Sequence, residues 1–307
     1  MESLPSECTY EILLFCNHRD LLLCSQVNQN LNDLCHLESL WKIQVEEKYK
    51  LLFNKKSYKD TCKMYYQINK IKNELKSPEY QNIYIDELYT IQLIDCADSK
   101  LNAIPKEINI LTNLTYISLG FNQIKKIPKE MCDLVNLEYL FLSNNEIEEI
   151  PKEIGQLTNL QKLVICRNKI NILPKEIGSL INLTELWMFG NQIKKIPKEI
   201  KHLTKLRHLS LKNNQLESIP SEIGQLTNLL LLDLSYNKLK MIPIEIGKLI
   251  RLENMNLTNN RLKTLPKEIT LLSNLRNLNT SDNYGIHLPL EIIKMTNVRI
   301  TNTTTFE

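Results

Sequence analysis

The chain has 307 residues, of which 43% are hydrophobic and 24% are charged. This composition is that of a folded globular protein and excludes a mainly disordered chain. The formal net charge of +3 is too small to indicate a nucleic-acid or membrane-surface protein by itself. No apolar run approaches the roughly 18 residues of a transmembrane helix, and the first residues lack the basic and apolar segments of an export signal. We therefore expect a cytoplasmic protein.

Eight cysteines bear on redox state and on cofactors. They stand at positions 8, 16, 24, 35, 62, 96, 132 and 166, and none of them forms a CxxC pair. Without an export signal the thiols are expected to stay reduced, and the spacings typical of zinc sites are absent. We expect the cysteines to be small apolar packing groups, and we expect no metal and no cofactor.

The first 45 residues predict three short helices, because apolar residues recur at helical spacing. Asp20 is suited to cap a helix that begins at Leu21. Three helices of this size make a poor independent domain, so part of their apolar surface is expected to contact a partner.

This segment resembles an F-box, the module through which substrate receptors bind the Skp-type adaptor of cullin–RING ubiquitin ligases. The matching residues include a Leu-Pro opening and a Leu-Trp ending in the expected places, together with Glu7, Asp20 and Leu34. The resemblance implies an adaptor-binding surface made of Leu4, Pro5, Ile12, Leu13, Leu21, Val27, Leu40 and Trp41. The alternative is a helical cap that only shields the domain that follows, and we favour the F-box.

Residues 46–90 are expected to form a linking helix and an N-terminal cap. Apolar residues recur every three or four positions over residues 57–76, and Ser77 and Pro78 end the pattern. Lysines on the outer face are interspersed with Asp60 and Glu74, which favours a solvated face over an anion-binding strip.

From residue 91 onward the sequence repeats every 23 residues. Nine prolines keep this spacing without an insertion or a deletion: Pro105, Pro128, Pro151, Pro174, Pro197, Pro220, Pro243, Pro266 and Pro289. Around them runs the pattern LxxLxLxxNxIxxIPxEIGxLTNL, and nine units reach Asn297 before Val298 begins a partial tenth. One unit buries too little apolar surface to fold alone, so a stack of units, a solenoid, is predicted.

Each part of the unit predicts a local structure. The alternating leucines indicate a short strand with one buried face, and IPxEI favours a short helical turn with Pro at its first position. The amide of the asparagine after each strand can both donate and accept, so stacked asparagines can bind backbone groups at the turn. This predicted structural ladder consists of Asn122, Asn145, Asn168, Asn191, Asn214, Asn237, Asn260 and Asn283.

Residues 91–301 resemble the leucine-rich repeat family, specifically its 23-residue IPxEIGxLxNL type. The predicted fold is therefore α/β: a right-handed leucine-rich repeat solenoid with parallel strands on the concave face and short helical turns on the convex face, preceded by the all-α F-box-like domain. Residues 302–307 are expected to form a tail. We also expect Val298, Ile300 and Phe306 to fold back as an imperfect cap.

Some positions of the predicted strands, and of the short segments just after them, carry different residue types from unit to unit. The side chains at these variable positions are expected to face outward on the concave side. Aromatic residues gather there, on strands about 4.8 Å apart, and we interpret them as one contiguous target-binding patch. The patch consists of Tyr116, Phe121, Tyr139, Phe141, Lys162, Val164, Arg167, Glu185, Trp187 and Phe189. The alternative is that these aromatics only fill space between strands. On the convex side, lysines and glutamates alternate, which favours a solvated face.

The sequence contains no catalytic pattern, since a Gly-rich phosphate loop, an HExxH motif and a serine nucleophile elbow are absent, and we expect no enzymatic activity. The two resemblances together imply a non-catalytic substrate-recognition subunit of a cullin–RING (SCF-type) ubiquitin ligase. In that role the F-box would bind the Skp-type adaptor and the repeats would bind a target protein. The alternative is an intracellular leucine-rich repeat scaffold for a signalling protein, with no ubiquitin link.

We expect neither a membrane nor a nucleic acid among the partners, because the predicted concave face is nearly neutral. The expected location is the cytoplasm or the nucleus. The high content of Lys, Asn and Ile indicates an AT-rich genome, and a viral source would place the protein in the host cell cytoplasm.

Overall fold

The computed structural model describes residue 71, residues 74–75 and residues 90–302. Contacts divide the chain into two compact units, Met1–Thr90 and Ile91–Glu307. Of the predicted linking helix, Ile71, Glu74 and Leu75 are described; all three are helical, Ile71 and Leu75 are buried and Glu74 is exposed. The predicted F-box residues lie outside the described residues.

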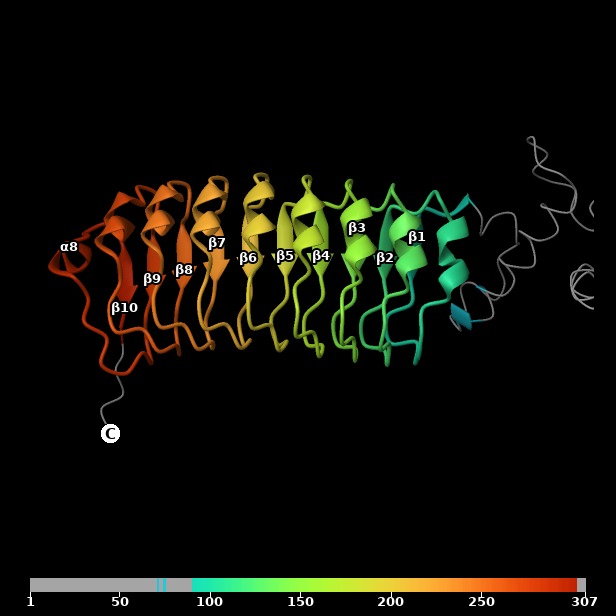
Figure 1. Cartoon of the computed structure of the whole chain (residues 1–307), viewed down its shortest axis with the longest axis horizontal. Coiled ribbons are helices and arrows are strands. Elements are labelled where there is room, and N and C mark those ends of the chain that lie inside the picture. The colour runs from blue at the N-terminus through green and yellow to red at the C-terminus, as the bar shows by residue number, and fades with distance from the viewer. Residues whose placement is uncertain (1–70, 72–73, 76–89, 303–307) are drawn as a thin grey trace, which may run out of the picture. The chain divides into compact units, whose positions relative to one another are not determined.

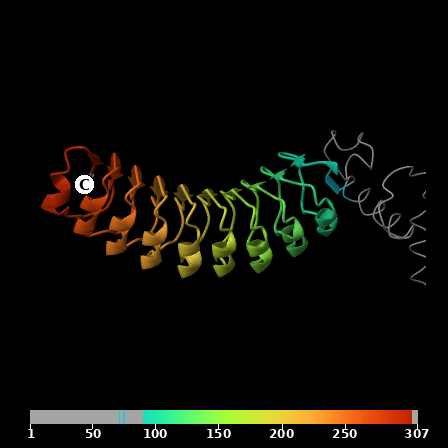
Figure 2. The same ribbon diagram turned by 90° about the horizontal axis from the view of Figure 1, so that it is seen from above.

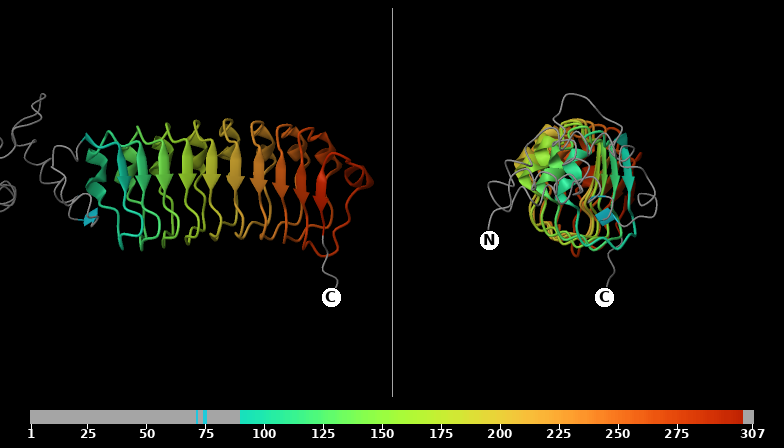
Figure 3. Two further views of the ribbon diagram at one scale, coloured as in Figure 1. Left: turned by 180° about the vertical axis from the view of Figure 1, so that it is seen from behind. Right: turned by 90° about the vertical axis from the view of Figure 1, so that its right-hand side faces the viewer.

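Residues 91–302 form a stack of coils, each of which contributes one strand to a single sheet (Figure 1). The sheet has ten parallel strands that follow one another in chain order. Figure 3 shows the strands side by side along the stack. They are β1 (Leu93–Asp95), β2 (Tyr116–Ser118), β3 (Tyr139–Phe141), β4 (Lys162–Val164), β5 (Glu185–Trp187), β6 (His208–Ser210), β7 (Leu231–Asp233), β8 (Asn254–Asn256), β9 (Asn277–Asn279) and β10 (Arg299–Thr301). The predicted leucine-rich repeat solenoid is confirmed.

Short helical turns form the other side of the stack. Eight of them are 3₁₀ helices of five residues: η1 (Lys106–Ile110), η2 (Lys129–Asp133), η3 (Lys152–Gln156), η4 (Lys175–Ser179), η5 (Lys198–His202), η6 (Ser221–Gln225), η7 (Ile244–Lys248) and η8 (Lys267–Leu271). The ninth turn is an α-helix, α8 (Leu290–Ile293).

The repeated proline stands one position earlier than predicted. Pro151, for example, is the N-cap of η3, and its carbonyl accepts the N–H of Ile154 at 3.0 Å. This i to i+3 bond is the one that defines a 3₁₀ turn. Glu153 lies in the first turn, where a carboxylate interacts favourably with the free N–H groups of the helix.

The stack is curved, with the strands on the inner, concave side and the helical turns on the outer side (Figure 2). Parallel strands pack about 4.8 Å apart, whereas helical turns need more width, so the outer side is longer than the inner side. The curvature places one face of every strand on a continuous concave surface.

The core lies between the sheet and the helical turns and consists of rows of aliphatic side chains. In one unit Leu137, Leu140, Leu142, Ile147 and Leu157 are completely buried. The middle residue of each strand belongs to such a row, because it points away from the concave surface. Each row continues into the next coil, so the coils stabilise one another.

The predicted C-terminal cap is wrong in its described part. Ile300 pairs with Leu278, so it extends the sheet as part of β10 instead of folding back over it. The paired residues are 22 positions apart, one fewer than between the earlier strands. This register places Ile300 on the row of Leu278, where a 23-residue spacing would place Thr301, and the apolar side chain determines the choice. Phe306 lies outside the described residues.

Candidate protein-interaction surface

Two rows of side chains cover the concave surface, because the first and third residues of each strand face outward. The first row is Leu93, Tyr116, Tyr139, Lys162, Glu185, His208, Leu231, Asn254 and Asn277. The other row is Asp95, Ser118, Phe141, Val164, Trp187, Ser210, Asp233, Asn256 and Asn279. The surface therefore carries aromatic rings on β2, β3 and β5 and is rich in asparagine over β8 and β9.

We call Tyr116, Tyr139, Phe141, Val164 and Trp187 the inner aromatic patch. The ring of Tyr116 lies 5.2 Å from that of Phe141 and 6.2 Å from that of Tyr139, in tilted arrangements that aromatic pairs prefer. Val164 pairs with Phe141 on one side and with Trp187 on the other, so the patch is continuous. All five side chains keep part of their surface exposed. The rings hold one another in place and leave an ordered apolar surface.

Charged groups border this patch and are already paired. Lys162 Nζ lies 2.7 Å from Glu185 Oε2, and Trp187 Nε1 donates a hydrogen bond of 2.8 Å to the same oxygen. His208 Nδ1 lies 3.9 Å from Glu185 Oε1, and its ring lies 6.1 Å from that of Trp187. The carboxylate of Glu185 therefore links the side chains of β4 and β5, and the ring of His208 on β6 lies beside them.

Opposing effects act on the pKa of Glu185. Burial alone raises the pKa of this carboxyl, but hydrogen bonds from Lys162 and Trp187 and the charges of Lys162 and His208 outweigh burial and lower it below its usual value. His208 was not among the predicted target-binding residues. Its position opposite Glu185 follows from the 23-residue spacing, which was a signal available in the sequence.

The substitution Lys162→Met is expected to raise the pKa of Glu185, because burial remains while the hydrogen bond and the charge of Lys162 are lost. A lowered pKa contributes stability above the pKa of the unfolded chain, and this contribution is lost as pH falls through the folded value. In the variant that contribution shrinks. Carboxyl NMR titration, with the Glu185 signal assigned from Glu185→Gln, measures the shift. As a control, Lys169→Met removes the exposed partner of Glu146 and leaves the Glu185 titration unchanged; an unchanged Glu185 pKa in Lys162→Met would contradict the expectation.

Three residues of the predicted patch lie in the loops just after the strands. Phe121 and Arg167 occupy the position before the ladder asparagine, and Phe189 follows β5. Arg167 Cζ lies 5.7 Å from the centre of the Phe189 ring, and Lys212 Nζ lies 5.4 Å from that of Tyr236. We call Phe121, Arg167, Phe189, Lys212 and Tyr236 the rim. The predicted patch thus consists of a strand part and a loop part.

The position before the ladder asparagine, or before Ser99 in the first coil, has a left-handed backbone in every coil from Asp98 to Asp282. Six of the nine residues there are those that tolerate a positive φ: Asp98, Asn144, Gly190, Asn213, Asn259 and Asp282. Phe121, Arg167 and Tyr236, with φ values of 57°, 52° and 56°, are the exceptions. A bulky residue in this conformation is strained by about 1–2 kcal/mol, and such strain often accompanies a function.

The substitution Phe121→Asn is therefore expected to raise the free energy of unfolding of the repeats by about 1 kcal/mol, because asparagine tolerates the left-handed conformation. The side chain of Phe121 is 63% exposed, so its removal leaves no cavity. Urea denaturation followed by circular dichroism measures the change. Phe121→Leu, which keeps a strained side chain, serves as the matched control and should give no gain. Equal stability of the asparagine and leucine variants would show that strain at this position is negligible.

The predicted asparagine ladder lies on the buried side of the same loops. Each ladder amide accepts an N–H of the preceding coil and donates to carbonyls of residues that follow its own strand and the preceding one. Asn168 Oδ1 accepts from Ile147 N at 2.9 Å, and its Nδ2 lies 3.0 Å from Leu142 O and 3.1 Å from Cys166 O. The bonds to the N–H and to the carbonyl of the preceding coil recur at the other ladder residues: Asn122, Asn145, Asn191, Asn214, Asn237, Asn260 and Asn283. The ladder joins coils and leaves the concave surface free.

A second, exposed row of asparagines was missed at the sequence level. In five coils the asparagine of the LxNL segment donates a hydrogen bond of 2.7–2.9 Å to a carbonyl 24 residues earlier: Asn136, Asn159, Asn182, Asn228 and Asn274. Where a cation replaces the asparagine, Lys205 Nζ and Arg251 bind the amide oxygens of Asn182 and Asn228. The repeated LxNL pattern was the available signal for this row.

Two other kinds of site, a metal centre and a membrane-spanning helix, have no counterpart among the described residues. None of their His, Cys, Asp and Glu side chains forms a group of three that could hold a metal ion, and none of their helices has the length and apolar character needed to cross a membrane. Cys96, Cys132 and Cys166 are buried and unpaired with one another. Burial, aided by Glu153, Asp133 and Glu130, raises the pKa of Cys132 to about 12, so this thiol is protonated at neutral pH.

Models of two protein families match the two parts of the chain. A model described as a leucine-rich repeat region matches residues 86–218 and 195–305. The chain belongs to the leucine-rich repeat family. An F-box-like model matches residues 1–45, which confirms the resemblance of this segment to an F-box. An F-box-like domain joined to leucine-rich repeats is the architecture of a protein-interaction adaptor.

Solved structures show the same repeat fold. A leucine-rich repeat protein of Leptospira interrogans is 36% identical over 70% of this chain and 61% of its own, with a TM-score of 0.57. The ectodomain of the receptor kinase GASSHO1/SCHENGEN3 of Arabidopsis thaliana, solved in complex with CASPARIAN STRIP INTEGRITY FACTOR 2, is 23% identical over 78% of this chain and 35% of its own, with a TM-score of 0.62. An internalin of Listeria monocytogenes is 23% identical over 76% and 75%, with a TM-score of 0.56. This chain therefore spans less than two-thirds of the first two proteins, and the last two show the fold alone. No curated protein matches the chain.

Proposed function

We propose that the chain is a substrate receptor of an SCF-type cullin–RING ubiquitin ligase. In this proposal the F-box-like domain binds a Skp-type adaptor and the repeats bind a target protein. The observation that supports it is the presence, in one chain, of the F-box-like match at residues 1–45 and the repeat match at residues 86–305. The receptor itself catalyses nothing, and it acts by holding the target near the charged conjugating enzyme, which raises the effective concentration of the target.

The inner aromatic patch is the proposed centre of target binding. Ordered aromatic rings lose little side-chain entropy when a partner covers them, and such residues dominate the binding energy of protein interfaces. Because Lys162 and Glu185 are already paired, a partner does not need to neutralise either charge at the edge of the patch. These features favour a partner that places apolar side chains on β2–β5.

The decisive experiment is co-purification of the tagged full chain with a Skp-type adaptor and cullin. The double substitution Leu4→Ala/Pro5→Ala is expected to reduce recovery of the adaptor at least about tenfold, which corresponds to a loss of about 1.4 kcal/mol. Phe141→Ala/Trp187→Ala is the matched control, because it changes the repeats and should leave adaptor recovery unchanged. Circular dichroism of both variants checks that the repeats stay folded. Failure of the unsubstituted chain to recover the adaptor would overturn the ligase role.

Target binding is tested on the same samples. Mass spectrometry of proteins recovered with the full chain is expected to show partners that Leu4→Ala/Pro5→Ala retains and that Phe141→Ala/Trp187→Ala loses. Partners retained by both variants would place target binding outside the inner aromatic patch.

The second candidate is a leucine-rich repeat scaffold without a ubiquitin link. The similarity to solved structures favours it in one respect, because the Leptospira protein, which matches 70% of this chain, is a leucine-rich repeat protein. Recovery of target proteins by the unsubstituted chain, without any adaptor or cullin, would favour the scaffold.

A further inference from the structure

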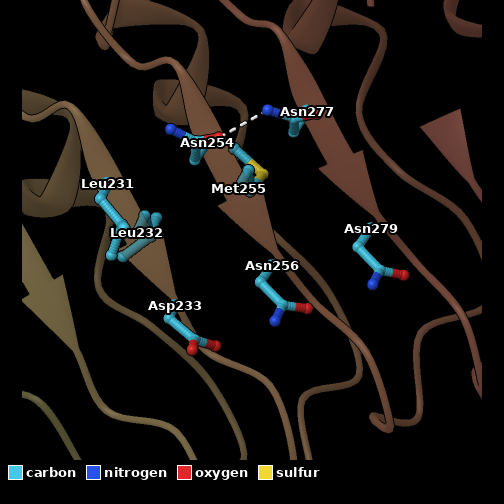
Figure 4. A pocket seen from close by; sticks show the side chains of 8 residues that line it. All are labelled: Leu231, Leu232, Asp233, Asn254, Met255, Asn256, Asn277 and Asn279. Carbon is cyan, nitrogen blue, oxygen red and sulfur yellow. Dashed lines mark hydrogen bonds between the residues drawn. The ribbon is translucent and has the colours of Figure 1, made fainter. Parts of the chain in front are cut away.

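The concave surface over β7, β8 and β9 differs in chemistry from the inner aromatic patch. A groove there is lined by Asp233, Asn254, Asn256, Asn277 and Asn279, with main-chain and apolar atoms of Leu231, Leu232 and Met255 (Figure 4). We call it the amide groove. Its polar side chains carry one formal charge, that of Asp233, and four neutral amides.

Hydrogen bonds to the loop after each strand fix the orientation of the row formed by the third strand residues. Asn256 Oδ1 accepts from Thr258 Oγ1 at 2.7 Å and from Thr258 N at 3.1 Å. Asn279 Oδ1 accepts from Ser281 N at 3.1 Å. Because each oxygen is used in this way, the Nδ2 group of each amide remains as a donor toward the groove. In Figure 4 the nitrogen atoms of Asn256 and Asn279 lie on corresponding sides of the two amides.

The remaining polar groups supply acceptors. Asp233 Oδ1 accepts from Ser235 Oγ at 2.6 Å and from Ser235 N at 3.0 Å, which leaves Oδ2 for a ligand. Asn277 Nδ2 donates a hydrogen bond of 2.7 Å to Asn254 Oδ1, as Figure 4 shows. This bond leaves Asn277 Oδ1 as an acceptor and Asn254 Nδ2 as a donor. The groove thus presents oriented donors and acceptors side by side.

These groups match the main chain of a polypeptide. Each peptide unit carries one N–H donor and one carbonyl acceptor and no charge, so it can use amide donors and carboxylate or amide acceptors together. An anionic ligand is disfavoured, because Asp233 would repel it and the lining residues supply no cation. A sugar usually needs an aromatic platform beside its hydrogen bonds, and the lining residues include no aromatic ring.

We propose that the amide groove binds the main chain of an extended polypeptide segment, with Asn256 and Asn279 as donors and Asp233 and Asn277 as acceptors. The inference rests on the proposed function in that the segment belongs to the target protein. The two outward rows continue from the groove to the inner aromatic patch, so one segment that crosses the strands can place apolar side chains on β2–β5 and its backbone on β7–β9. The repeats then recognise side chains at one end of the surface and backbone at the other.

The test uses the full chain and a displayed library of random 12-residue peptides as the probe. Peptides that bind the unsubstituted chain are measured again on Asn256→Asp/Asn279→Asp. Aspartate keeps the oxygen that accepts from Thr258 and Ser281 but replaces the outward donor, so the loops stay ordered. Affinity is expected to fall at least about tenfold, as loss of two hydrogen bonds implies. Asn213→Asp, an exposed residue after β6, is the matched control and should bind as the unsubstituted chain does.

A second measurement distinguishes backbone from side-chain recognition. In the selected peptides, single peptide bonds are replaced by esters, which removes one N–H donor and weakens one carbonyl. At least one such replacement is expected to weaken binding about tenfold to the unsubstituted chain and to have little further effect on Asn256→Asp/Asn279→Asp. Esters without effect, or selected peptides that bind the double variant normally, would overturn the proposal.

Two further outcomes are informative. If the library yields no binder while a glycan array does, the groove binds sugars and the proposal is wrong. Adaptor recovery is measured separately on the same variants, so the ligase role and the groove can fail independently. Groove-dependent peptide binding without adaptor binding supports the inference and contradicts the proposed function.

Discussion

Replacing Asn168 with alanine is expected to lower the free energy of unfolding of the repeats by about 2–4 kcal/mol. The substitution removes one acceptor and one amide donor group that together bind Ile147 N, Leu142 O and Cys166 O. Asn168 is only 8% exposed, so water cannot readily replace these bonds. A buried polar group left without a partner costs about 1–3 kcal/mol, and here more than one is affected.

Urea denaturation of the full chain, followed by circular dichroism, measures this loss. Asn159→Ala is the matched control, because Asn159 also donates to a backbone carbonyl, Val135 O at 2.9 Å, but it does so at an exposed position. Water can take over that bond, so a loss below about 1 kcal/mol is expected. Equal losses for the two variants would show that burial of the ladder does not govern its contribution.

The substitution Gly178→Ala is expected to destabilise the repeats by about 1–3 kcal/mol through overpacking. Gly178 is buried in η4, and a Cβ atom added there would lie 2.4 Å from Glu199 O and 2.9 Å from Glu199 C. Both are backbone atoms of η5, which cannot move aside as the end of a flexible side chain can. The two helical turns would have to separate, and the aliphatic rows beneath them would lose contact.

The same substitution one coil earlier provides the comparison. At Gly155 an added Cβ would lie 3.0 Å from Glu176 O, so a smaller shift relieves the contact and a smaller loss of stability is expected. Denaturation midpoints of the two alanine variants, measured side by side, check the order. A larger loss for Gly155→Ala would contradict the view that the distance between neighbouring helical turns limits the residue at this position.

The sequence was sufficient to predict the repeat and the strand positions. Pro105 and its eight counterparts set the period, and alternating leucines identified the buried row, so Leu140, Leu163 and Leu186 are neighbours as expected. The pairing of Lys162 with Glu185 also follows from the period, because these residues are 23 positions apart. In a strictly periodic chain, residues one period apart in the sequence lie next to each other in the structure.

Other features did not follow from the period. The letters keep their 23-residue spacing as far as Pro289 and Asn297, yet β10 pairs one residue early because Ile300 is apolar. The left-handed backbone of Phe121 and Arg167, which turns the chain just after the strand, was not predicted. The frequent Asn, Asp and Gly at the same position of other coils indicated that turn.

The oriented amides of Asn256 and Asn279 depend on bonds to residues two positions later, and such bonds are decided by side-chain rotamers. The residue types Asp and Asn at these positions show only that the region is polar. The direction in which each amide points could not be predicted from the sequence.

The ladder of buried asparagines has a consequence for how such a protein changes during evolution. Asn168 and Asn214 make equivalent bonds to equivalent atoms of their own and the preceding coils. An in-frame duplication of 69 nucleotides, the coding length of one coil, therefore inserts a module that finds suitable neighbours on both sides. Length can be gained or lost in such steps while every joint is preserved, so the reach of the protein toward its ligands can change faster than its architecture.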